Sequence, residues 1–391
     1  MLTLRFSIIL LGFLISQTII VGITNSYSQE TFVYVTNGED GNISIFELNS
    51  GTGDMKMVTK VPAEQKVMHM AVSPDQRFLY ASIRAEPYSA ITYLINPETG
   101  NLSQISKELL PANMVYISVD QTGRFLLSVS YNEAKIAVNS IELDGTIQPQ
   151  PVQIISTGAK PHSILSDLSN RFVFVPHLGT SQIKQFLFNE NNGTLVANEP
   201  SAINTKDNSG PRHLEFSPDN KFVYVSNEID GTVYAYELDN KTGVLKEIQR
   251  ISAMPRNFSF QDRGEITSDD KVTNLGVADI HITPDGKWLY TSERASSTIA
   301  AFAVDNQSGV LTHIQNYDTE KIPRGINIDP SGHFVLAAGQ ESGYLSIYEI
   351  NQDTGELNYL DRYESGKSPN WIEIVEYIQE LWYDNFYNVF Q

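Results

Sequence analysis

The sequence contains no cysteine. Disulfide bonds, thiolate-bound zinc or iron–sulfur centres, a cysteine nucleophile and a lipid-modified anchor cysteine are therefore excluded. Basic residues are scarce, since 27 lysines and arginines stand against 46 aspartates and glutamates and leave a formal net charge of −19. Such an acidic surface repels nucleic acid and anionic membranes, so neither is an expected partner. Any local group of arginines runs against this background and is informative.

A long apolar run occurs at the N-terminus. Arg5 supplies a positive start, the apolar run extends over residues 6–23, and Ser26, Tyr27 and Ser28 offer a cleavage site between small residues. These features predict that residues 1–28 are a signal peptide and that the protein is exported to the periplasm, the cell surface or the medium. An uncut membrane anchor is the alternative. After cleavage, no stable membrane insertion is expected.

Sustained helical periodicity is absent, which excludes a helical solenoid. A short aromatic and β-branched strand instead recurs seven times, mostly at intervals of 46 to 50 residues. Turns such as Ser73–Pro74–Asp75 precede these strands, and a hairpin loop containing a glycine follows later in each repeat. Four short strands per repeat predict an all-β fold, a seven-bladed β-propeller of four-stranded blades. The recurring strands begin at Phe32, Phe78, Phe125, Phe172, Phe222, Trp288 and Phe334.

The register of the repeat also predicts how the ring closes. The innermost strand of each blade precedes the proline-containing turn, and the seventh such strand is Asn370–Ile374, near the C-terminus. The chain therefore starts on the second strand of a blade and ends by supplying the innermost strand of that same blade, which removes open sheet edges. One domain is predicted at residues 31–377.

Two segments depart from the repeat. The longest interval between strands contains an insertion of roughly 20 residues at 254–277, between an outermost strand and the next innermost strand. The tail at 378–391 is rich in aromatic residues and has no place in the ring. For the tail, a disordered or side-packed extension and a docking or membrane-contact role are both consistent with the sequence. The insertion is expected on the face that carries the candidate site, where it could act as a lid.

Two positions in each blade are expected to meet at one mouth of the central channel. They are the start of the innermost strand and the residue after the second strand; the proline-containing turns lie on the opposite face. Histidines and arginines gather there despite the acidic composition. A polar, purely structural channel is the alternative explanation for any single residue. The candidates are His69, His162, Arg212, His213, Asp279, His281 and Arg324 at strand starts, and Glu228, Arg294 and Gln340 after second strands.

These residue types suit an anionic, oxygen-rich small molecule. Arginines bind carboxylate or phosphate through two nitrogens and stabilise a developing oxyanion. A neighbouring histidine or glutamate can activate water. The sequence has no glycine-rich phosphate loop, serine-nucleophile motif or zinc-protease motif, so no cofactor is predicted. A calcium site at Glu228 and Asp279 has no diagnostic spacing, and no metal is predicted.

Several motifs resemble the seven-bladed propeller lactonases, the family that includes the bacterial propeller-type 6-phosphogluconolactonase and, more distantly, the fungal carboxy-cis,cis-muconate lactonizing enzyme. The resemblance covers residues 31–377, in motif order as well as in repeat length. It rests on Gly210–His213, Ala278–Gly286, Pro323–Gly325 and Ala338–Gln340, together with segments near Ser130, Ser226 and Pro255.

The resemblance implies hydrolysis of a sugar-acid lactone, with a small anionic lactone or sugar acid as the partner molecule. By blade position, it implies catalytic roles for His162, Arg212, Glu228 and Arg294. Arg212 and Arg294 would bind the carboxylate or carbonyl oxygen, and Glu228 or His162 would be the base. A non-catalytic propeller that binds a small ligand or a protein, and a cycloisomerase, are the competing functions. The expected substrate-binding residues are His69, His213, Asp279, His281, Arg324 and Gln340.

Overall fold

The computed structural model describes residues 26–256, 258 and 276–381. Most of the predicted signal peptide, the insertion at 254–277 and the tail at 378–391 therefore lie outside the described residues. The propeller itself is a compact unit spanning Glu30–Tyr377. No helix among the described residues has the length and hydropathy that a membrane span requires.

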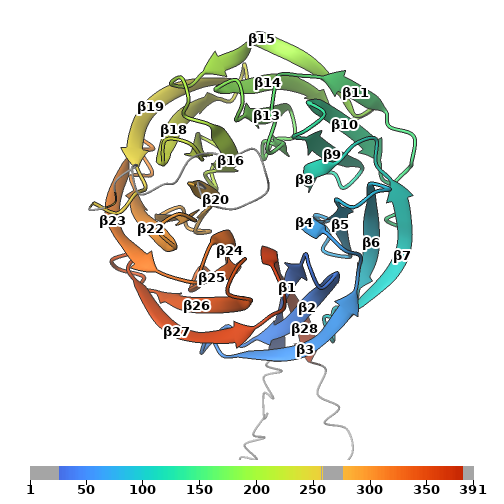
Figure 1. The fold of residues 1–391 in the computed structure, drawn as a ribbon, viewed down its shortest axis with the longest axis vertical. Coiled ribbons are helices and arrows are strands. Elements are labelled where there is room, and N and C mark those ends of the chain that lie inside the picture. Colours follow the sequence, from blue (N-terminus) through green and yellow to red (C-terminus); the bar gives the residue numbers. More distant parts are fainter. Residues whose placement is uncertain (1–25, 257, 259–275, 382–391) are drawn as a thin grey trace, which may run out of the picture. The chain divides into compact units, whose positions relative to one another are not determined.

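The described strands form seven four-stranded antiparallel sheets arranged as blades around a centre, which confirms the predicted fold (Figure 1). Blade 1 comprises β28 (Pro369–Leu381), β1 (Ser26–Asn37), β2 (Asn42–Leu48) and β3 (Met55–Pro62). Blade 2 comprises β4 (Val67–Val72), β5 (Phe78–Ile83), β6 (Ser89–Ile95) and β7 (Leu102–Leu109), and blade 3 comprises β8 (Met114–Val119), β9 (Phe125–Ser130), β10 (Lys135–Ser140) and β11 (Gln153–Ser156). Blade 4 comprises β12 (Leu165–Ser166), β13 (Phe172–His177), β14 (Gln182–Asn189) and β15 (Thr194–Asn204), and blade 5 comprises β16 (Pro211–Phe216), β17 (Phe222–Asn227), β18 (Thr232–Asp239) and β19 (Val244–Ser252). Blade 6 comprises β20 (Val277–Ile282), β21 (Trp288–Glu293), β22 (Thr298–Val304) and β23 (Leu311–Asp318), and blade 7 comprises β24 (Pro323–Ile328), β25 (Phe334–Gly339), β26 (Tyr344–Ile350) and β27 (Leu357–Glu364).

The C-terminal strand closes the ring as predicted. Strand β28 is the innermost strand of blade 1 and lies beside β1 (Figure 1). Side chains support this joint, since Asn370 Nδ2 donates to the carbonyl oxygen of Thr36 at 3.3 Å and Ser365 Oγ donates to Asn37 Oδ1 at 2.8 Å. Strand β1 begins at Ser26, before the predicted start of the ring at residue 31, because its polar first residues give little strand signal in the sequence.

One innermost strand is shorter than predicted. The sequence indicated a strand over His162–Leu165, but β12 contains only Leu165 and Ser166. Ahead of β12 only an isolated bridge between Pro161 and His177 forms, although the same left-handed residue and proline precede a full strand at Pro323 in blade 7. His162 is therefore carried by irregular backbone.

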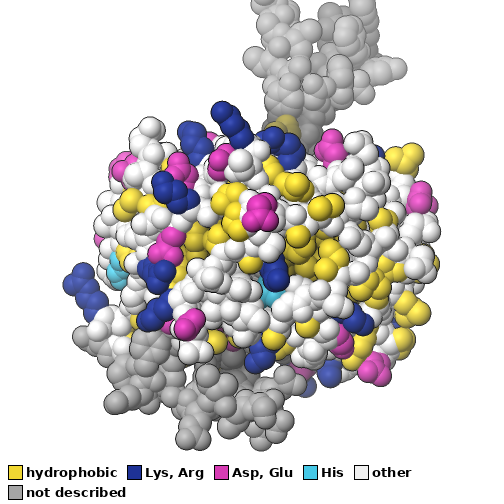
Figure 2. Space-filling view, turned by 90° about the horizontal axis from the view of Figure 1, so that it is seen from above, with side chains coloured by type: hydrophobic (Ala, Val, Ile, Leu, Met, Phe, Trp, Pro, Cys, Tyr) yellow, Lys and Arg dark blue, Asp and Glu magenta, His cyan; other side chains and the backbone are white. Residues whose placement is uncertain are grey.

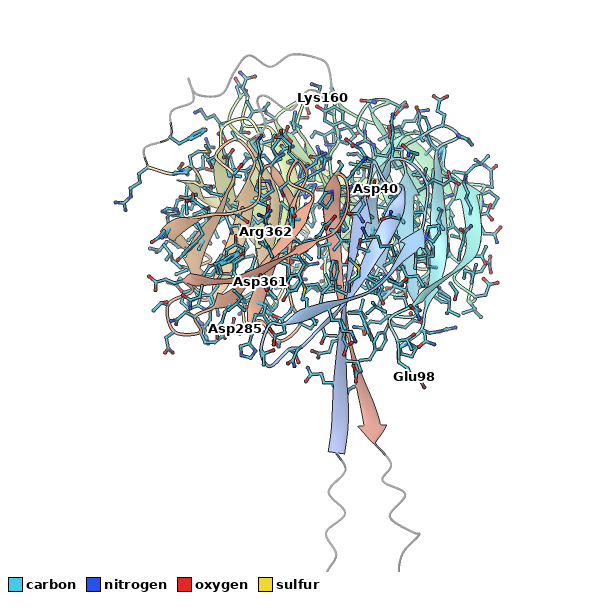
Figure 3. The ribbon with its side chains drawn as sticks, turned by 60° about the horizontal axis from the view of Figure 1, so that its bottom comes forward. Asp40, Glu98, Lys160, Asp285, Asp361 and Arg362 are labelled. Atoms are coloured by element: carbon cyan, nitrogen blue, oxygen red, sulfur yellow. The ribbon has the colours of Figure 1, made fainter. Side chains whose placement is uncertain are left out.

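The two faces of the ring carry different loops. Figure 3 shows Lys160, which precedes the inner part of blade 4, on the face opposite to Asp285, which belongs to a proline-containing turn. In that turn, Thr283 Oγ1 donates to Asp285 Oδ1 at 2.7 Å and accepts from the backbone N–H of Trp288 at 3.0 Å. Side chains within the turn thus satisfy its own polar groups. The candidate site is instead expected among the loops on the other face.

The outer surface shows no concentration of one charge on the face drawn in Figure 2, where basic, acidic and hydrophobic side chains are interspersed. The apolar core instead lies between adjacent blades. Tyr34, Tyr224 and Tyr290 are fully buried there, and the hydroxyls of Tyr34 and Tyr290 donate to the carbonyl oxygens of Gly100 and Gly355 in the next blade round the ring. Tyr34 and Tyr290 therefore link their own blades to the next.

A glycine in each outer hairpin loop packs against the aromatic residue that begins the second strand of the neighbouring blade. At Gly243, φ is +70°, and an added Cβ would lie 2.1 Å from Cδ1 of Phe172. Only glycine adopts this backbone without strain and leaves room for the ring. The sequence markers of the repeat, the aromatic residue and the glycine, are thus two halves of one contact between blades. The pairs are Gly53–Phe334, Gly100–Phe32, Gly145–Phe78, Gly193–Phe125, Gly243–Phe172, Gly309–Phe222 and Gly355–Trp288.

Gly243→Ala is expected to lower the free energy of unfolding by about 1–3 kcal/mol, because the new methyl group displaces the Phe172 ring and strains the backbone. Thermal or denaturant unfolding measures the change. Gly51→Ala is the matched control, since Gly51 lies in an equivalent loop but has no positive φ and meets only Asn49 Oδ1 at 3.4 Å. If Gly243→Ala lowers the free energy of unfolding no more than Gly51→Ala does, the proposed contact is wrong.

Candidate active site

A β-bulge near the start of the innermost strand presents the candidate residues to the channel. In blade 5, pairing between β16 and β17 passes from Pro211–Asn227 to Leu214–Val225, so Arg212 and His213 form the bulge. An unbroken strand would send these two side chains to opposite faces, whereas a bulge redirects one of them. Both consequently line the same pocket. The corresponding register shifts occur in β4, β8, β20 and β24.

These residues surround a cavity of about 330 Å³ on the channel. Five of the lining side chains are cationic and one is acidic, in a protein with a strongly negative overall charge. The cavity therefore attracts an anion that the rest of the surface repels. Its lining residues are Lys66, Met68, Arg84, Asn113, Val115, Tyr131, Asn132, His162, Arg212, Glu228, Arg294 and Arg324.

Glu228 is held by two arginines through one of its two carboxylate oxygens. Arg212 Nε donates to Glu228 Oε2 at 2.8 Å, and Arg294 Nη2 lies 3.0 Å from the same oxygen. Burial alone would raise the pKa of Glu228, but the two guanidiniums outweigh it and hold the pKa below its ordinary value. No described residue donates a hydrogen bond to Oε1. The carboxylate is thus ionised, fixed at one oxygen and available at the other.

Arg212 and Arg294 are themselves anchored on the protein side. Arg212 Nη1 donates to the carbonyl oxygen of Ala278 at 2.7 Å, and Arg294 Nε donates to that of Gly276 at 3.2 Å. Both arginines are almost fully buried. Burial, together with the neighbouring Arg294, lowers the pKa of Arg212 to about 10, so it remains a cation at neutral pH.

Arg324 differs from these two arginines. It lines the cavity from β24 and is partly buried, yet its guanidinium forms no hydrogen bond or ion pair with another described residue. Burial, with further contributions from Arg212 and Arg294, lowers its pKa well below the ordinary value. A guanidinium held among other cations without a counter-ion is suited to receive an anion or a developing negative charge.

The inner end of the cavity is formed by aromatic rings from five blades. The ring of His69 lies between those of Tyr116 and Trp371, with centroid distances of 3.7 and 3.6 Å. The rings of His162 and His213 are 5.2 Å apart, and His213 is also 5.2 Å from Tyr116. The pocket that several of these rings line has a volume of about 10 Å³, enough for about one water molecule.

The buried histidines of this group are uncharged near neutral pH. Burial is the main reason that the pKa values of His69 and His162 lie well below 6.5. Burial and then Arg212 lower the pKa of His213 to about 3. Neither ring nitrogen of His69, nor Nδ1 of His162, has a hydrogen-bond partner among the described residues. These nitrogens are therefore available to water or to a bound molecule.

A second charged group lies on the protein side of His213. His213 Nδ1 is 2.9 Å from Asp279 Oδ1, and His281 Nε2 is 3.5 Å from Asp279 Oδ2. His281 Nδ1 is 3.8 Å from Glu215 Oε2. Burial opposes the ionisation of Asp279, but His281 and His213 keep its pKa well below the ordinary value. Burial raises the pKa values of Glu215 and Glu373 to about 7.

His281 is expected to make stability depend on pH above neutrality. Burial disfavours its charged form, but Asp279 and then Glu215 raise its pKa from 6.5 to about 9. A group whose pKa is higher in the folded state than in the unfolded state stabilises the fold below pH 6.5. This stabilisation is lost as the pH rises toward 9. The melting temperature should therefore fall between pH 6.5 and pH 9. The corresponding fall should be smaller in His281→Gln; an equal fall in both proteins would contradict this assignment.

The structure brings seven of the ten candidate residues to the cavity and its inner end: His69, His162, Arg212, His213, Glu228, Arg294 and Arg324. Asp279 and His281 lie behind His213. Gln340 is not among the lining residues; its Nε2 donates to Ser368 Oγ at 3.4 Å. Lys66, Met68, Asn113, Val115 and Tyr131 line the cavity but were not identified from the sequence. These residues lie immediately before or after a strand, or in a β-bulge. At such positions the repeat pattern does not predict the direction of a side chain.

No group of three or more acidic or histidine side chains among the described residues has a geometry suited to a metal ion. Glu228 and Asp279, the pair considered for calcium, have other partners. Glu228 is bound by two arginines and Asp279 by two histidines.

A seven-bladed ring with a cavity rich in arginine and histidine at its channel defines the class of this protein. The family model described as "Lactonase, 7-bladed beta-propeller" matches residues 26–374. The chain belongs to this family of seven-bladed β-propeller lactonases.

Two relatives are similar over most of their length. A 6-phosphogluconolactonase of Enterobacter sp. (strain 638) is 36% identical over 295 residues, which is 75% of this chain and 84% of the relative. The structure of the periplasmic gluconolactonase of Pseudomonas aeruginosa superposes with a TM-score of 0.79 and 25% identity, covering 89% of this chain and 99% of that one.

Proposed function

We propose that the protein hydrolyses a sugar-acid lactone in the cavity around Glu228. The observation that carries the proposal is the arrangement of Glu228 itself: Oε2 is held by Arg212 and Arg294, while Oε1 has no described donor and Arg324 lines the same cavity with no counter-ion among the described residues. An ionised base can take the proton of the attacking water, and a guanidinium that is free among the described residues can stabilise the developing oxyanion.

In the proposed reaction, Arg324 binds the carbonyl oxygen of the lactone. Glu228 Oε1 takes a proton from a water molecule as that water attacks the carbonyl carbon, and negative charge develops on the oxygen held by Arg324. The tetrahedral intermediate then collapses, the bond from the carbonyl carbon to the ring oxygen breaks, and protonated Glu228 returns its proton to that ring oxygen. The product is the open-chain hydroxy acid, and Glu228 is again a carboxylate.

His162 is the other candidate base, and the geometry favours a supporting role. Its imidazole is uncharged because burial and the surrounding arginines lower its pKa. It is therefore able to donate or accept a hydrogen bond to a hydroxyl of the substrate or to the attacking water. In this assignment Arg212 and Arg294 fix Glu228, whereas from the sequence they were expected to bind the carboxylate or carbonyl oxygen of the substrate.

We further propose that the protein acts outside the cytoplasm. The N-terminal residues fit a signal peptide, and the similar Pseudomonas protein is a periplasmic gluconolactonase. An unphosphorylated aldonolactone is the substrate that such a location favours, whereas the Enterobacter relative is named for a phosphorylated one.

The test is acid release from a panel of lactones at pH 6–6.5, recorded in a pH-stat against the spontaneous rate. The panel includes glucono-1,5-lactone, 6-phosphoglucono-1,5-lactone and a simple alkyl lactone. We expect accelerated opening of a sugar lactone and little acceleration of the alkyl lactone. No acceleration of any lactone, with the folded protein still binding one of them, would instead support a non-catalytic ligand-binding propeller.

A further inference from the structure

Asp279 touches neither Glu228 nor the cavity, yet it is joined to Glu228 by a continuous series of hydrogen bonds through the buried side chains of His213 and Arg212. We infer that Asp279 is a positioning residue, which acts through His213 to hold Arg212 on Glu228 so that Oε1 of Glu228 stays open to water. This inference rests on the proposed function and adds a residue to that machinery.

The first step is the contact between Arg212 and His213. Arg212 Nη1 lies 3.0 Å from His213 Nε2. A guanidinium has no acceptor, so His213 Nε2 must carry a lone pair and accept the hydrogen bond. With Nε2 unprotonated, the proton of the neutral imidazole is on Nδ1.

The second step is the contact that favours this tautomer. His213 Nδ1 lies 2.9 Å from Asp279 Oδ1, and an ionised carboxylate is only an acceptor. The opposite tautomer would place an N–H against Arg212 and a lone pair against Asp279, which is repulsive at both ends. Arg212, His213 and Asp279 are all less than 5% exposed, so water cannot readily replace either contact. Asp279 thereby determines which nitrogen of His213 faces Arg212.

Asp279 is itself fixed by the backbone of two blades. The N–H of Ile280 donates to Oδ1 at 3.1 Å, and the N–H of Ile326, from blade 7, donates to Oδ2 at 3.2 Å. His281 supplies a positive charge on the Oδ2 side at 3.5 Å. The carboxylate therefore has little freedom to turn away from His213.

The last step is the effect on Glu228. If His213 adopts the other tautomer, Arg212 Nη1 meets an N–H in place of an acceptor, and only the Ala278 carbonyl oxygen still holds this nitrogen, so the guanidinium is held less firmly on Glu228 Oε2. The charged groups that face Glu228 are Arg212 and Arg294 in contact and Arg324 farther off. A weaker hold by Arg212 leaves burial to raise the pKa of Glu228.

Asp279→Asn tests the inference, with Asp329→Asn as the matched control. Asp329 is equally buried and accepts hydrogen bonds from the backbone N–H groups of His333 and Phe334, but it belongs to a turn on the opposite face. We expect Asp279→Asn to lower kcat about 10- to 100-fold, a typical cost of removing a group that orients a functional side chain. Its acid limb of kcat/KM should move to higher pH, whereas Asp329→Asn should lose stability with neither change.

A double variant separates positioning from a general loss of structure. In His213→Gln, the amide oxygen of glutamine is able to accept from Arg212 without any choice of tautomer. Adding Asp279→Asn to His213→Gln should then cost much less activity than Asp279→Asn alone. Losses that simply multiply would overturn the inference.

A measurement that does not depend on turnover tests this inference separately from the proposed function. In protein labelled with ¹⁵N-histidine, the nitrogen chemical shifts of His213 should show Nδ1 protonated in the wild type and a shift toward Nε2–H in Asp279→Asn. Protonated Nε2 in the wild type would overturn the inference even if Asp279→Asn does not fold. A wild type that opens no lactone but shows the expected tautomer contradicts the proposed function alone.

Discussion

Glu228→Gln is expected to lower kcat for lactone opening by about 10²–10⁴-fold, the range that general base catalysis contributes. Glutamine has nearly the same shape and keeps an oxygen that accepts from Arg212 and Arg294, but it cannot take a proton from water. Substrate contacts made by Arg324 and His162 remain, so KM should change less than kcat. Steady-state acid release on the best substrate of the panel measures both constants.

The loss of charge at Glu228 also affects folding, because two buried guanidiniums lose their counter-ion. Glu320→Gln is the matched control for this effect. Glu320 is a buried carboxylate that accepts from Arg362 at 2.9 Å and from Ser346 at 2.7 Å, and it does not line the cavity. Glu320→Gln should lose stability and keep its kcat. Full activity in folded Glu228→Gln would exclude Glu228 as the base and leave His162 as the candidate.

Arg324→Gln is expected to lower kcat by about 10²–10³-fold, the typical cost of removing one donor to a developing oxyanion. The same change should leave the melting temperature unchanged or raise it, since a partly buried cation with no described counter-ion opposes folding. Activity and stability should thus move independently. Enzyme assays and thermal unfolding of the same preparations measure the two effects.

Arg324→Lys sharpens the interpretation. Lysine keeps the positive charge but loses the planar pair of donors, so we expect an activity between those of the wild type and Arg324→Gln. If Arg324→Gln instead destabilises the protein and its activity falls only in proportion to the unfolded fraction, Arg324 has a structural role and the proposed oxyanion contact is wrong.

Much of the fold could be predicted from the sequence because its markers recur along the chain. The aromatic residue at the second strand and the glycine in the outer hairpin occur in all seven blades, and a polar turn precedes six of the second strands. The structure explains this regularity, since glycines such as Gly243 pack on aromatic residues such as Phe172 in the neighbouring blade. Asn370 could be placed in the closing strand by the same register. The pattern failed at His162, which lies outside the two-residue strand β12.

The candidate site could be predicted only as a set of residues. The positions of Arg212, Glu228 and Arg294 in the repeat predict that they meet at one mouth of the channel. These positions do not predict the distances between the side chains. The sequence therefore could not show that both arginines bind Oε2 of Glu228, or that the Arg324 guanidinium has no counter-ion among the described residues. The β-bulge that turns Arg212 and His213 toward the same pocket depends on tertiary pairing and has no signature of its own. The contact between His213 and Asp279 joins neighbouring blades in the same way.

The central claim is that lactones are opened in the cavity around Glu228. A crystal structure of the full chain after turnover of its best lactone, with the hydroxy-acid product bound, tests it most directly. We expect the product carboxylate within hydrogen-bond distance of Arg324, with Glu228 Oε1 facing the carbon that water attacked. A product bound outside this cavity, with Arg324 and Glu228 making no contact to it, would show that lactones are not opened there.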